Sequence, residues 1–443
     1  MHALRALALL APLLWSCAGP SQTTRHRELE EAWLRAAPAP AAPADDPFAG
    51  HAALERRALI EAVLAKNPTI ASARWAWRAA LARHPQETAL DDPTLEYVVG
   101  PRSFGSSSVD DAHRVVLAQA LPFPGKLALR GEIALAEAEA AARDHEAVRL
   151  RLAMLASLLF DEHYLLARKL AVNEAHRALL AELREIAVVR YEAGSASQQD
   201  PLEAELAEAE LLHREVELRA DQRIAAERLN VLLHRAPELP LPPPPTALEV
   251  LEPAGPRDAL LSRAREGRPE LHAAEARVRA REAAVALARR EYLPDLRVMG
   301  GYDSFWEESD QRPLVGLELN LPLQRARRAA ALDEAEASLE AARSESLALG
   351  DEVRLSVERA LAELAEAHHA LEIFRDRMLP AATDRVTWAR AAFEAGQSDF
   401  STVIDAERDL RDAELGYEET VVAVSRRHAE LARATGALPG GAR

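Results

Sequence analysis

Hydrophobic residues recur with two different periods along this chain of 443 residues. Between residues 125 and 191 they recur three and four positions apart, as in Leu152, Leu155 and Leu159, which is the spacing of one face of an α-helix. A helix over about 67 residues would be roughly 100 Å long at about 1.5 Å per residue. That length predicts a coiled coil or a helical tube, because ordinary globular helices are much shorter.

Gly194 predicts the end of this long helix, because glycine readily takes the left-handed conformation that closes helices. The Ser, Gln and Asp residues after it permit a turn, and a second helix is expected to return over residues 201–230. The second half of the chain predicts the same arrangement. There a helix is expected over 326–393, with a kink at Pro380, and a returning helix over 401–435.

Four shorter segments alternate between apolar and polar residues with a period of two, which predicts β-strands of about 8 to 10 residues. In the last of them Val315, Leu317 and Leu319 alternate with Gly316 and Glu318. One polar loop separates the first two segments and another separates the last two, so two β-hairpins are expected. The four segments are residues 94–100, 115–121, 295–302 and 315–321.

The two halves of the chain carry the same landmarks in the same order. Leu117 precedes Leu317 by 200 residues, and Gly194 precedes Gly396 by 202 residues, in similar surrounding phrases. A near-constant offset predicts an internal duplication. The eight prolines of the segment between the repeats exclude a helix there, so an extended linker is expected. The first repeat is expected over 51–235, the linker over 236–256 and the second repeat over 257–443.

The N-terminal segment predicts export from the cytoplasm. Arg5 precedes an apolar run that is too short to span a bilayer, which is typical of a signal peptide over residues 1–16. The residues before Cys17, the single cysteine, resemble a bacterial lipobox, so lipid attachment at Cys17 is expected. The alternative is a plain secretory signal with an incidental cysteine. Residues 17–50, rich in Pro and Ala, are expected to be a tether with nothing periodic to bury.

The composition excludes several classes of function. The formal net charge is −17, and the sequence has no Lys/Arg cluster that could form a basic surface for nucleic acid. No P-loop, glycine-rich phosphate turn or nucleophile elbow occurs, so no catalysis and no cofactor are predicted. The adjacent His368 and His369 lie in a predicted helix without further ligands at helical spacing, so a solvent-facing pair is favoured over a metal site.

The predicted strands suit a membrane. A tilted strand of about 9 to 11 residues crosses a bilayer, and the alternation places leucines on one face and polar residues on the other. Four strands cannot close by themselves, and an open sheet edge is not tolerated in lipid. Three copies of the chain would supply twelve strands to one shared barrel. The alternative is a soluble domain of two hairpins that caps a coiled coil.

The segment LPFPGK, residues 121–126, lies where the second predicted strand should be followed by the long helix. Pro122 and Pro124 lack the N–H donor that a strand ladder needs, and Gly125 allows the backbone to change direction. Phe123 suits a membrane interface. These four residues are predicted to form an elbow from strand to helix, after which Lys126 begins the first helical turn.

Several sequence segments, by their order and spacing, make the chain similar to a known family, the TolC-like outer-membrane efflux proteins. The segments are LPFPGKLALRGEIALAEAEAA, RYEAGSASQQDPLEAE, AFEAGQSDFSTVIDAE and ERLNVLLH, together with the proline linker. The resemblance is closest to the lipoprotein members that serve metal and drug efflux. It implies a mainly α fold with a small β part: a homotrimer with a 12-stranded outer-membrane barrel, four strands from each protomer, continued by a periplasmic coiled-coil tunnel. It also implies a periplasmic adaptor and an inner-membrane pump as partners.

Two positions depart from the family pattern. His234 stands where the family often has Gly. In the second half, Gln324 and Arg325 replace the Pro-Gly of the first elbow, while Pro322 is retained. The two elbows are therefore expected to differ.

The resemblance also implies roles for the helical turns. The periplasmic tip and adaptor contact would include Tyr191, Gly194, Asp200, Phe393 and Gly396. In relatives an acidic ring closes the tip, and here Asp405 matches one such carboxylate while Thr402 occupies the place of the other. The alternative for Asp200 and Asp405 is a favourable interaction of each carboxylate with a helix dipole.

The function implied is that of a passive outer-membrane exit duct in a tripartite efflux system. One alternative is the exit duct of a type I protein-secretion system. Another is a periplasmic coiled-coil lipoprotein scaffold that forms no pore.

Overall fold

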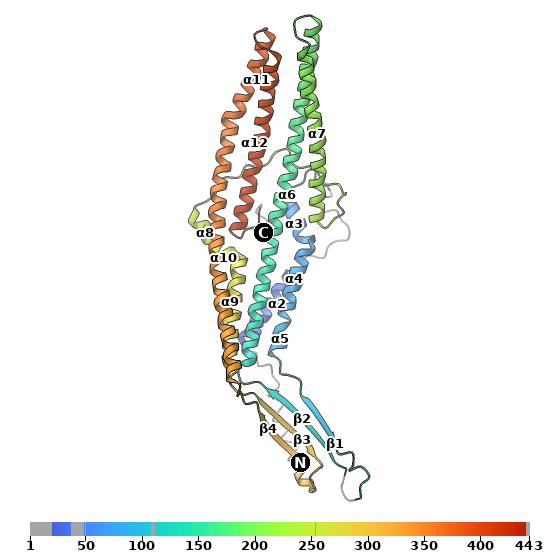
Figure 1. Cartoon of the computed structure of the whole chain (residues 1–443), viewed down its shortest axis with the longest axis vertical. Helices are drawn as coiled ribbons and strands as arrows, with labels where there is room; N and C mark the ends of the chain where they lie inside the picture. Colours follow the sequence, from blue (N-terminus) through green and yellow to red (C-terminus); the bar gives the residue numbers. More distant parts are fainter. Residues whose placement is uncertain (1–19, 37–47, 49, 108–110, 253, 440–443) are drawn as a thin grey trace. The chain divides into compact units, whose positions relative to one another are not determined.

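The computed structural model describes residues 20–36, 48, 50–107, 111–252 and 254–439 (Figure 1). The predicted signal peptide and Cys17 lie outside the described residues. The chain divides into two compact units, and both repeats contribute to each of them. The first unit comprises Met1–Ala37, Ala73–His145 and Glu270–Leu349, and the second comprises Pro38–Ser72, Glu146–Pro269 and Gly350–Arg443.

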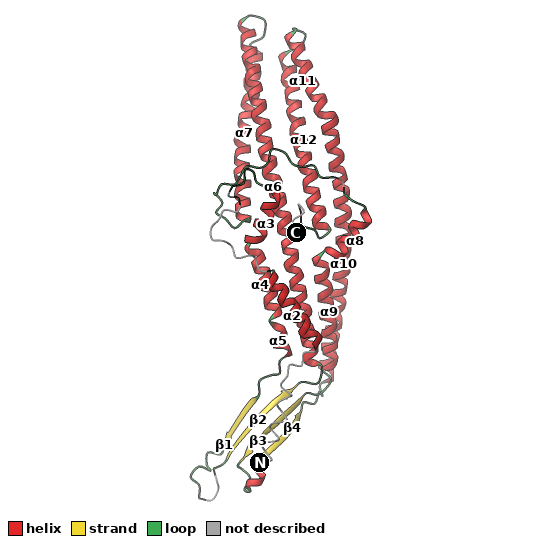
Figure 2. Cartoon of the chain, turned by 180° about the vertical axis from the view of Figure 1, so that it is seen from behind, coloured by secondary structure: helices red, strands yellow, loops and turns green. Residues whose placement is uncertain are grey.

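The first unit contains one antiparallel sheet of four strands in the order β1-β2-β3-β4 (Figures 1 and 2). The strands are β1 (Thr94–Val99), β2 (His113–Leu121), β3 (Leu296–Asp303) and β4 (Pro313–Leu319). Both predicted hairpins are present, and β2 pairs with β3 to join them. Strands β1 and β4 have six and seven residues, fewer than predicted. Pro93 and Pro101 flank β1, while Pro313 is the first residue of β4 and Pro322 follows its end, and proline does not continue a strand ladder.

The first unit also contains helices. They are α2 (Pro20–Arg35), most of α4 (Pro68–Leu81), α5 (Arg83–Thr88) and α9 (Pro269–Arg290), with the first parts of α6 (Lys126–Glu192) and α10 (Arg325–Ile373). Helices α4 and α9 begin at Pro68 and Pro269, and proline is favoured at the first position of a helix. None of the helices in the described residues combines the length and apolar composition that a membrane-crossing helix requires.

Helix α2 corrects the expectation of a tether over residues 17–50. Leu29 and Trp33 pack against a buried cluster that contains Trp77 of α4 and Ala138 of α6. Arg25 donates hydrogen bonds to Glu132 Oε1 at 2.7 Å and to Glu139 Oε1 at 2.5 Å, both on α6. The tether prediction is wrong for α2 because it applied the composition of the Pro/Ala-rich stretch to the residues before that stretch. Those residues have the apolar spacing of a helix.

The second unit consists of helices. It contains α3 (Arg56–Lys66), α7 (Gln199–Leu232), α8 (Arg257–Gly267), α11 (Leu379–Glu394) and α12 (Phe400–Ala434), with the remaining parts of α6 and α10. Helix α6 has 67 residues, which confirms the long helix. Helices α6 and α7 form one hairpin and α11 and α12 another (Figure 1). Near the hairpin turns an apolar cluster joins all four helices, with Leu183, Ala207, Val386 and Ile404 among its members.

The expected irregularity at Pro380 takes the form of a π-helical segment, Phe374–Met378, between α10 and α11. Proline lacks an N–H, and its ring conflicts with the carbonyl four residues earlier, here that of Asp376. On α12, Gly416 leaves room for the Phe374 ring, because a Cβ there would lie 2.3 Å from a ring carbon. The wider turn of the π-helical segment is therefore packed against α12.

The internal duplication is visible in the order of elements. Helices α3 and α4, strands β1 and β2, and helices α6 and α7 are followed by α8, α9, β3, β4, α10 with α11, and α12 in the same sequence of types. Each repeat contributes one hairpin to the sheet and one helical hairpin to the second unit. The described residues of 236–256 contain neither helix nor strand.

Candidate functional site

The two faces of the sheet differ in chemistry. The register pairs Leu95 with Leu117 and Val298 with Leu317, so these residues share one face, which is otherwise mostly apolar. All five charged residues of the described strands lie on the opposite face: Glu96, Arg114, Arg297, Asp303 and Glu318. On that face Arg297 and Glu318 pair across β3 and β4 at 3.7 Å.

The apolar face is exposed. Val315 is 89% exposed, Leu95 70% and Leu317 63%. Apolar side chains of this size are rarely left in water as a contiguous patch. The sheet also leaves one side of β1 and one side of β4 unpaired, and unpaired edges in an apolar medium are costly. An apolar medium against one face, with further strands along both edges, would satisfy both features.

The first elbow forms where the sequence predicts it. Strand β2 ends at Leu121 and α6 begins at Lys126. Gly125 has a φ of +90°, a conformation that favours glycine, and the Lys126 N–H donates to the Phe123 carbonyl at 3.0 Å. Pro122 and Pro124, which lack an N–H donor, prevent the hydrogen-bond ladder of β2 from continuing.

Lys126 has a role that sequence reasoning missed. Its side chain is 1% exposed, and Nζ lies 3.1 Å from Glu291 Oε2 and 2.9 Å from Asp295 Oδ1. Nζ also donates to the Leu293 carbonyl at 3.3 Å. The Phe123 N–H donates to the same Asp295 carboxylate at 2.7 Å. A buried ammonium requires such partners, but they come from a segment more than 160 residues away, and no local pattern indicates that pairing.

The second elbow differs from the first, as predicted. Between Leu319 and Arg325 no described residue has a positive φ. Instead, the Leu323 N–H donates to the Leu321 carbonyl at 2.9 Å, and the Arg325 N–H donates to the Leu323 carbonyl at the same distance. Pro322 is the central residue of the first of these two turns.

Both elbows connect to the segment 291–295, which precedes β3. From the second elbow, Arg328 Nε donates to the Glu291 carbonyl at 2.7 Å and the Asn320 N–H donates to the Asp295 carbonyl at 3.1 Å. Lys126 reaches the side chains of the same two residues. One short segment therefore joins both changes from strand to helix.

The two helical turns close with identical backbone bonds. Gly194 and Gly396 have φ values of +72° and +71°. The Gly194 N–H donates to the Tyr191 carbonyl and the next N–H reaches the Arg190 carbonyl, and the same two bonds recur at Gly396. Both glycines and Tyr191 are exposed, as an adaptor contact requires.

Phe393 does not fit the expected adaptor contact. It is 7% exposed and packs edge-on against Phe400, with ring centroids 5.3 Å apart. Arg190 of α6 lies over the Phe393 ring and donates to its carbonyl at 2.9 Å. Phe393 therefore stabilises the tip from inside, and the prediction of a direct contact is wrong because its helix face is turned to the apolar cluster.

Acidic residues gather at the starts of α7 and α12. Asp200 lies in the first turn of α7 and Asp405 in the second turn of α12, where Asp405 is exposed and 3.7 Å from Arg408. Burial raises the pKa of Glu203, and the neighbouring Asp405 raises it further. Thr402, also exposed, precedes Asp405 by one helical turn. The roles of Thr402 and Asp405 in an aperture stay predictions.

The adjacent histidines divide between two environments. His369 is exposed, as predicted, but His368 faces His428 of α12 with ring centroids 5.7 Å apart. Burial, with a smaller contribution from His368, lowers the pKa of His428. The solvent-facing prediction is therefore wrong for His368, because α12 covers its side of the helix. Within the part of the chain that the structure describes, no group of three or more His, Cys, Asp or Glu residues could hold a metal ion.

Comparisons with known proteins show what this chain is similar to. Residues 260–437 match the family model described as outer membrane efflux protein. The fold matches the outer-membrane channel OprN at 21% identity, covering 92% of this chain and 98% of OprN with a TM-score of 0.73. It matches the outer membrane protein VceC of Vibrio cholerae at 18% identity, covering 86% and 96% of the two chains with a TM-score of 0.73.

These matches make the chain similar to outer-membrane efflux proteins, and the likeness to the solved channels confirms the mainly helical fold with a four-stranded sheet. Among curated relatives, the chain is 27% identical over 172 residues to the cobalt-zinc-cadmium resistance protein CzcC of Cupriavidus metallidurans. That alignment covers 37% of this chain and 39% of the length of CzcC.

Proposed function

We propose that this chain forms the outer-membrane exit duct of a tripartite efflux system and conducts substrates passively. The observation that carries the proposal is the sheet, in which one face is apolar and exposed and the other holds all five charged residues of the described strands. This is the arrangement of a strand set with lipid on one side and an aqueous lumen on the other. The match to the outer membrane efflux protein family supports the same function.

The assembly proposed is a homotrimer. Four strands with two unpaired edges cannot form a closed barrel, whereas three copies supply twelve strands in which each β1 pairs with a β4 of the next copy. A periplasmic adaptor and an inner-membrane pump would meet the exposed turns at Gly194 and Gly396. The open edges support the twelve-stranded barrel, and the similarity to outer-membrane efflux proteins supports the partners.

A lipid anchor at Cys17 is part of the proposal. Gln22, at the start of α2, donates a hydrogen bond to the Ala128 carbonyl at 2.9 Å, which holds that end of α2 beside the first elbow. Three residue steps separate Cys17 from Pro20, so they span at most about 10 Å. A lipid on Cys17 would then reach the membrane at the level where the strands leave it.

The proposed cargo is a metal ion or another small molecule. The similarity to CzcC, a cobalt-zinc-cadmium resistance protein, supports metal efflux, and the shortness of that alignment leaves drugs as a second class. Type I protein secretion would use the same fold. Deletion of the gene followed by growth on graded Co²⁺, Zn²⁺ and Cd²⁺, and on hydrophobic drugs, separates these cargoes by which sensitivity increases.

The pore is tested with purified protein in detergent and in planar bilayers. A heat-sensitive trimer with a steady conductance is expected. A monomer without conductance, released from membranes by high salt, would instead favour the periplasmic scaffold. Leu317→Arg and Glu318→Arg form a matched pair on opposite faces of β4. We expect Leu317→Arg to destabilise the barrel by about 2–4 kcal/mol, because it places a charge in lipid, and Glu318→Arg to change ion selectivity instead.

The aperture is tested by Asp405→Ala. Carboxylates that converge from three protomers attract cations, so removing them should raise single-channel conductance or abolish its sensitivity to divalent cations. Asp412→Ala, an exposed carboxylate on the same helix paired with Arg411, is the control. Equal conductance and equal divalent sensitivity in Asp405→Ala and the wild type would exclude an aperture role for Asp405.

A further inference from the structure

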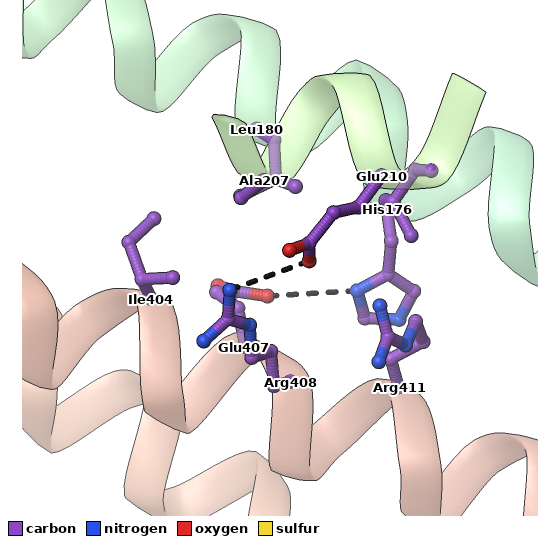
Figure 3. Close-up of a pocket in the computed structure, with 9 residues that line it drawn as sticks. His176, Leu180, Ala207, Glu210, Ile404, Glu407, Arg408 and Arg411 are labelled. Carbon is purple, nitrogen blue, oxygen red and sulfur yellow. Dashed lines mark hydrogen bonds and ion pairs between the residues drawn. The ribbon is translucent and has the colours of Figure 1, made fainter. Parts of the chain in front are cut away.

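A buried histidine of α6 lies between two carboxylates of α12, and Figure 3 shows its contact with one of them, Glu407. His176 has a side chain 7% exposed, and its Nε2 is 3.1 Å from Glu414 Oε2. Its Nδ1 is 3.7 Å from Oε2 of Glu407, whose side chain is 3% exposed. The first distance is that of a hydrogen bond and the second is too long for one. The contact between α6 and α12 is therefore made on one side of the ring and incomplete on the other.

The other charged groups around the ring are already paired. Arg390 of α11 donates to Glu407 Oε1 through Nε at 3.1 Å and Nη2 at 2.5 Å. From α7, Glu210 accepts from Arg408 at 3.4 Å, and Arg411 pairs with Asp412 at 3.0 Å. Glu407 Oε2 is left buried without a hydrogen bond. The adjoining cavity has a volume of about 10 Å³, room for about one water molecule.

The protonation state of His176 decides whether this arrangement is complete. A neutral imidazole has one N–H and one lone pair, so with Nε2 donating to Glu414 it presents a lone pair to the Glu407 oxygen. An imidazolium has two N–H groups and can donate to both carboxylates. Glu407 and Glu414 are seven residues apart, about two turns of α12. Protonation would therefore attach α6 to α12 at two points in place of one.

The position of this group relates it to the tip. Its neighbours Leu180, Ala207 and Ile404 belong to the apolar cluster near the hairpin turns (Figure 3). Further along the same pair of helices, Arg168 pairs with Glu418 and Lys169 with Glu419. Those cations stay charged at neutral pH, whereas histidine is the side chain whose charge ordinarily changes between about pH 5 and 8.

We propose that His176, Glu407 and Glu414 form a proton-operated latch that holds α6 against α12 and keeps the tip narrow in acid. The consequence for conduction rests on the proposed function as a duct. The latch itself is a property of the helix pair and is measurable without a pore. Acidification is expected to tighten it and mild alkali to release it.

Two readouts test the latch on the full chain in detergent or in planar bilayers. Between about pH 8 and pH 5.5, we expect the open-channel conductance or open probability to fall by about fivefold or more. Amide exchange of residues 170–182 and 400–415, corrected for the intrinsic effect of pH, should slow by a similar factor. Both responses should be lost in His176→Gln. Glu407→Gln is a second variant, which removes the carboxylate whose Oε2 lacks a hydrogen bond and should weaken the response if His176→Gln does not fold.

Lys169→Gln is the matched control, because it removes an α6–α12 ion pair without removing a group that titrates near neutral pH. It should keep the full pH response. A channel whose conductance and exchange are unaffected by pH, or whose pH response persists unchanged in His176→Gln, would overturn the latch. The absence of conductance at every pH would overturn the duct, while exchange that still slows in acid would support the latch independently.

Discussion

The two repeats end their last helices with the same backbone closure but different residues. At the end of α7 the His234 N–H donates to the Val231 carbonyl, and at the end of α12 the Gly436 N–H donates to the Arg433 carbonyl, both at 3.0 Å. Both residues are left-handed, with φ values of 55° and 77°. His234 is the only residue other than glycine with a positive φ in the described part of the chain. Both helix ends therefore use the same backbone closure, although glycine, the residue that suits a positive φ best, is present at only one of them.

The surroundings explain why the first repeat tolerates the substitution. His234 is exposed, whereas a Cβ on Gly436 would lie 2.3 Å from the Gly267 carbonyl oxygen. A side chain between two shorter helices caps each of these helix ends. Asn67, between α3 and α4, donates through Nδ2 to the Leu232 carbonyl at 2.9 Å, and Arg268, between α8 and α9, donates through Nη1 to the Arg433 carbonyl at 3.3 Å. The comparison separates the conformational requirement, which both ends share, from the steric one, which only the second end has.

The largest effect is expected at the sterically closed end. Gly436→Ala should destabilise the protein by about 3 kcal/mol, because the left-handed conformation costs about 1–2 kcal/mol and crowding against backbone adds a similar amount. His234→Ala keeps an ordinary L-residue in an exposed site and should change stability by less than about 0.5 kcal/mol. Thermal or chemical unfolding of the purified protein measures both. Equal effects at the two ends would contradict the steric difference.

A second difference between repeats lies at the elbows. Lys126→Met should destabilise the protein by about 2 kcal/mol, because it leaves Glu291 and Asp295 without their cation. Those side chains are 42% and 36% exposed, so water relieves part of the loss. Arg328→Met at the second elbow removes a bond to a backbone carbonyl and should cost about 1 kcal/mol or less. The unfolding midpoints of the two variants test this order, and a larger loss for Arg328→Met would reverse it.

The first repeat also carries Tyr164, which donates to Glu418 Oε2 of the second repeat at 3.1 Å. Burial, with the charge of Glu418, raises its pKa to about 12. Because an unfolded tyrosine has a pKa of about 10, the stabilisation is complete below about pH 10 and is lost as pH rises to about 12. Tyr164→Phe should cost about 1.5 kcal/mol at neutral pH and remove this alkaline decline.

Unfolding midpoints between about pH 9 and pH 12 measure that decline, with absorbance at the phenolate band as a direct titration. Tyr191→Phe, at the exposed helical turn, is the control and should leave the alkaline decline intact. A decline of the same size in Tyr164→Phe would assign it to other groups.

The smallest expected effect is a gain. His234→Gly should stabilise the protein by up to about 1 kcal/mol, because glycine avoids the left-handed cost but adds freedom to the unfolded chain. Gly194→Ala gives the complementary measurement: a Cβ there meets no atom within 4 Å, so its loss reports the conformational cost alone. If His234→Gly destabilises the protein, the histidine side chain must make a compensating contact.

Much of the fold follows from features that are local in sequence. The period of the apolar residues predicts α6 and the four strands, and Gly125, Gly194 and Gly396 predict the points where the backbone turns. Pro380 predicts the irregularity that lies just before it in the chain. These predictions succeed because each depends on the conformational limits of a residue or on one periodic face.

The features that sequence reasoning missed depend on contacts between distant segments. Lys126 meets Glu291 and Asp295 only after the two repeats are brought together in one sheet. The burial of Phe393 depends on which helices cover its face, and the His176 group combines residues of α6, α11 and α12. For α2 the apolar spacing was present, but a partner surface is needed to make a short amphipathic segment fold.

The π-helical segment before α11 has a consequence for how the duplicated arms diverged. Between Leu117 and Gly194 the offset to the second repeat grows from 200 to 202, so the second arm contains two more residues. One residue inserted into an α-helix rotates everything beyond it by about 100°, which would turn the apolar face of α11 away from α12. A π turn absorbs an extra residue locally. Such a turn acts as a phase correction for one of the two extra residues, so the helix faces beyond it are rotated by less than they would be in an uninterrupted α-helix.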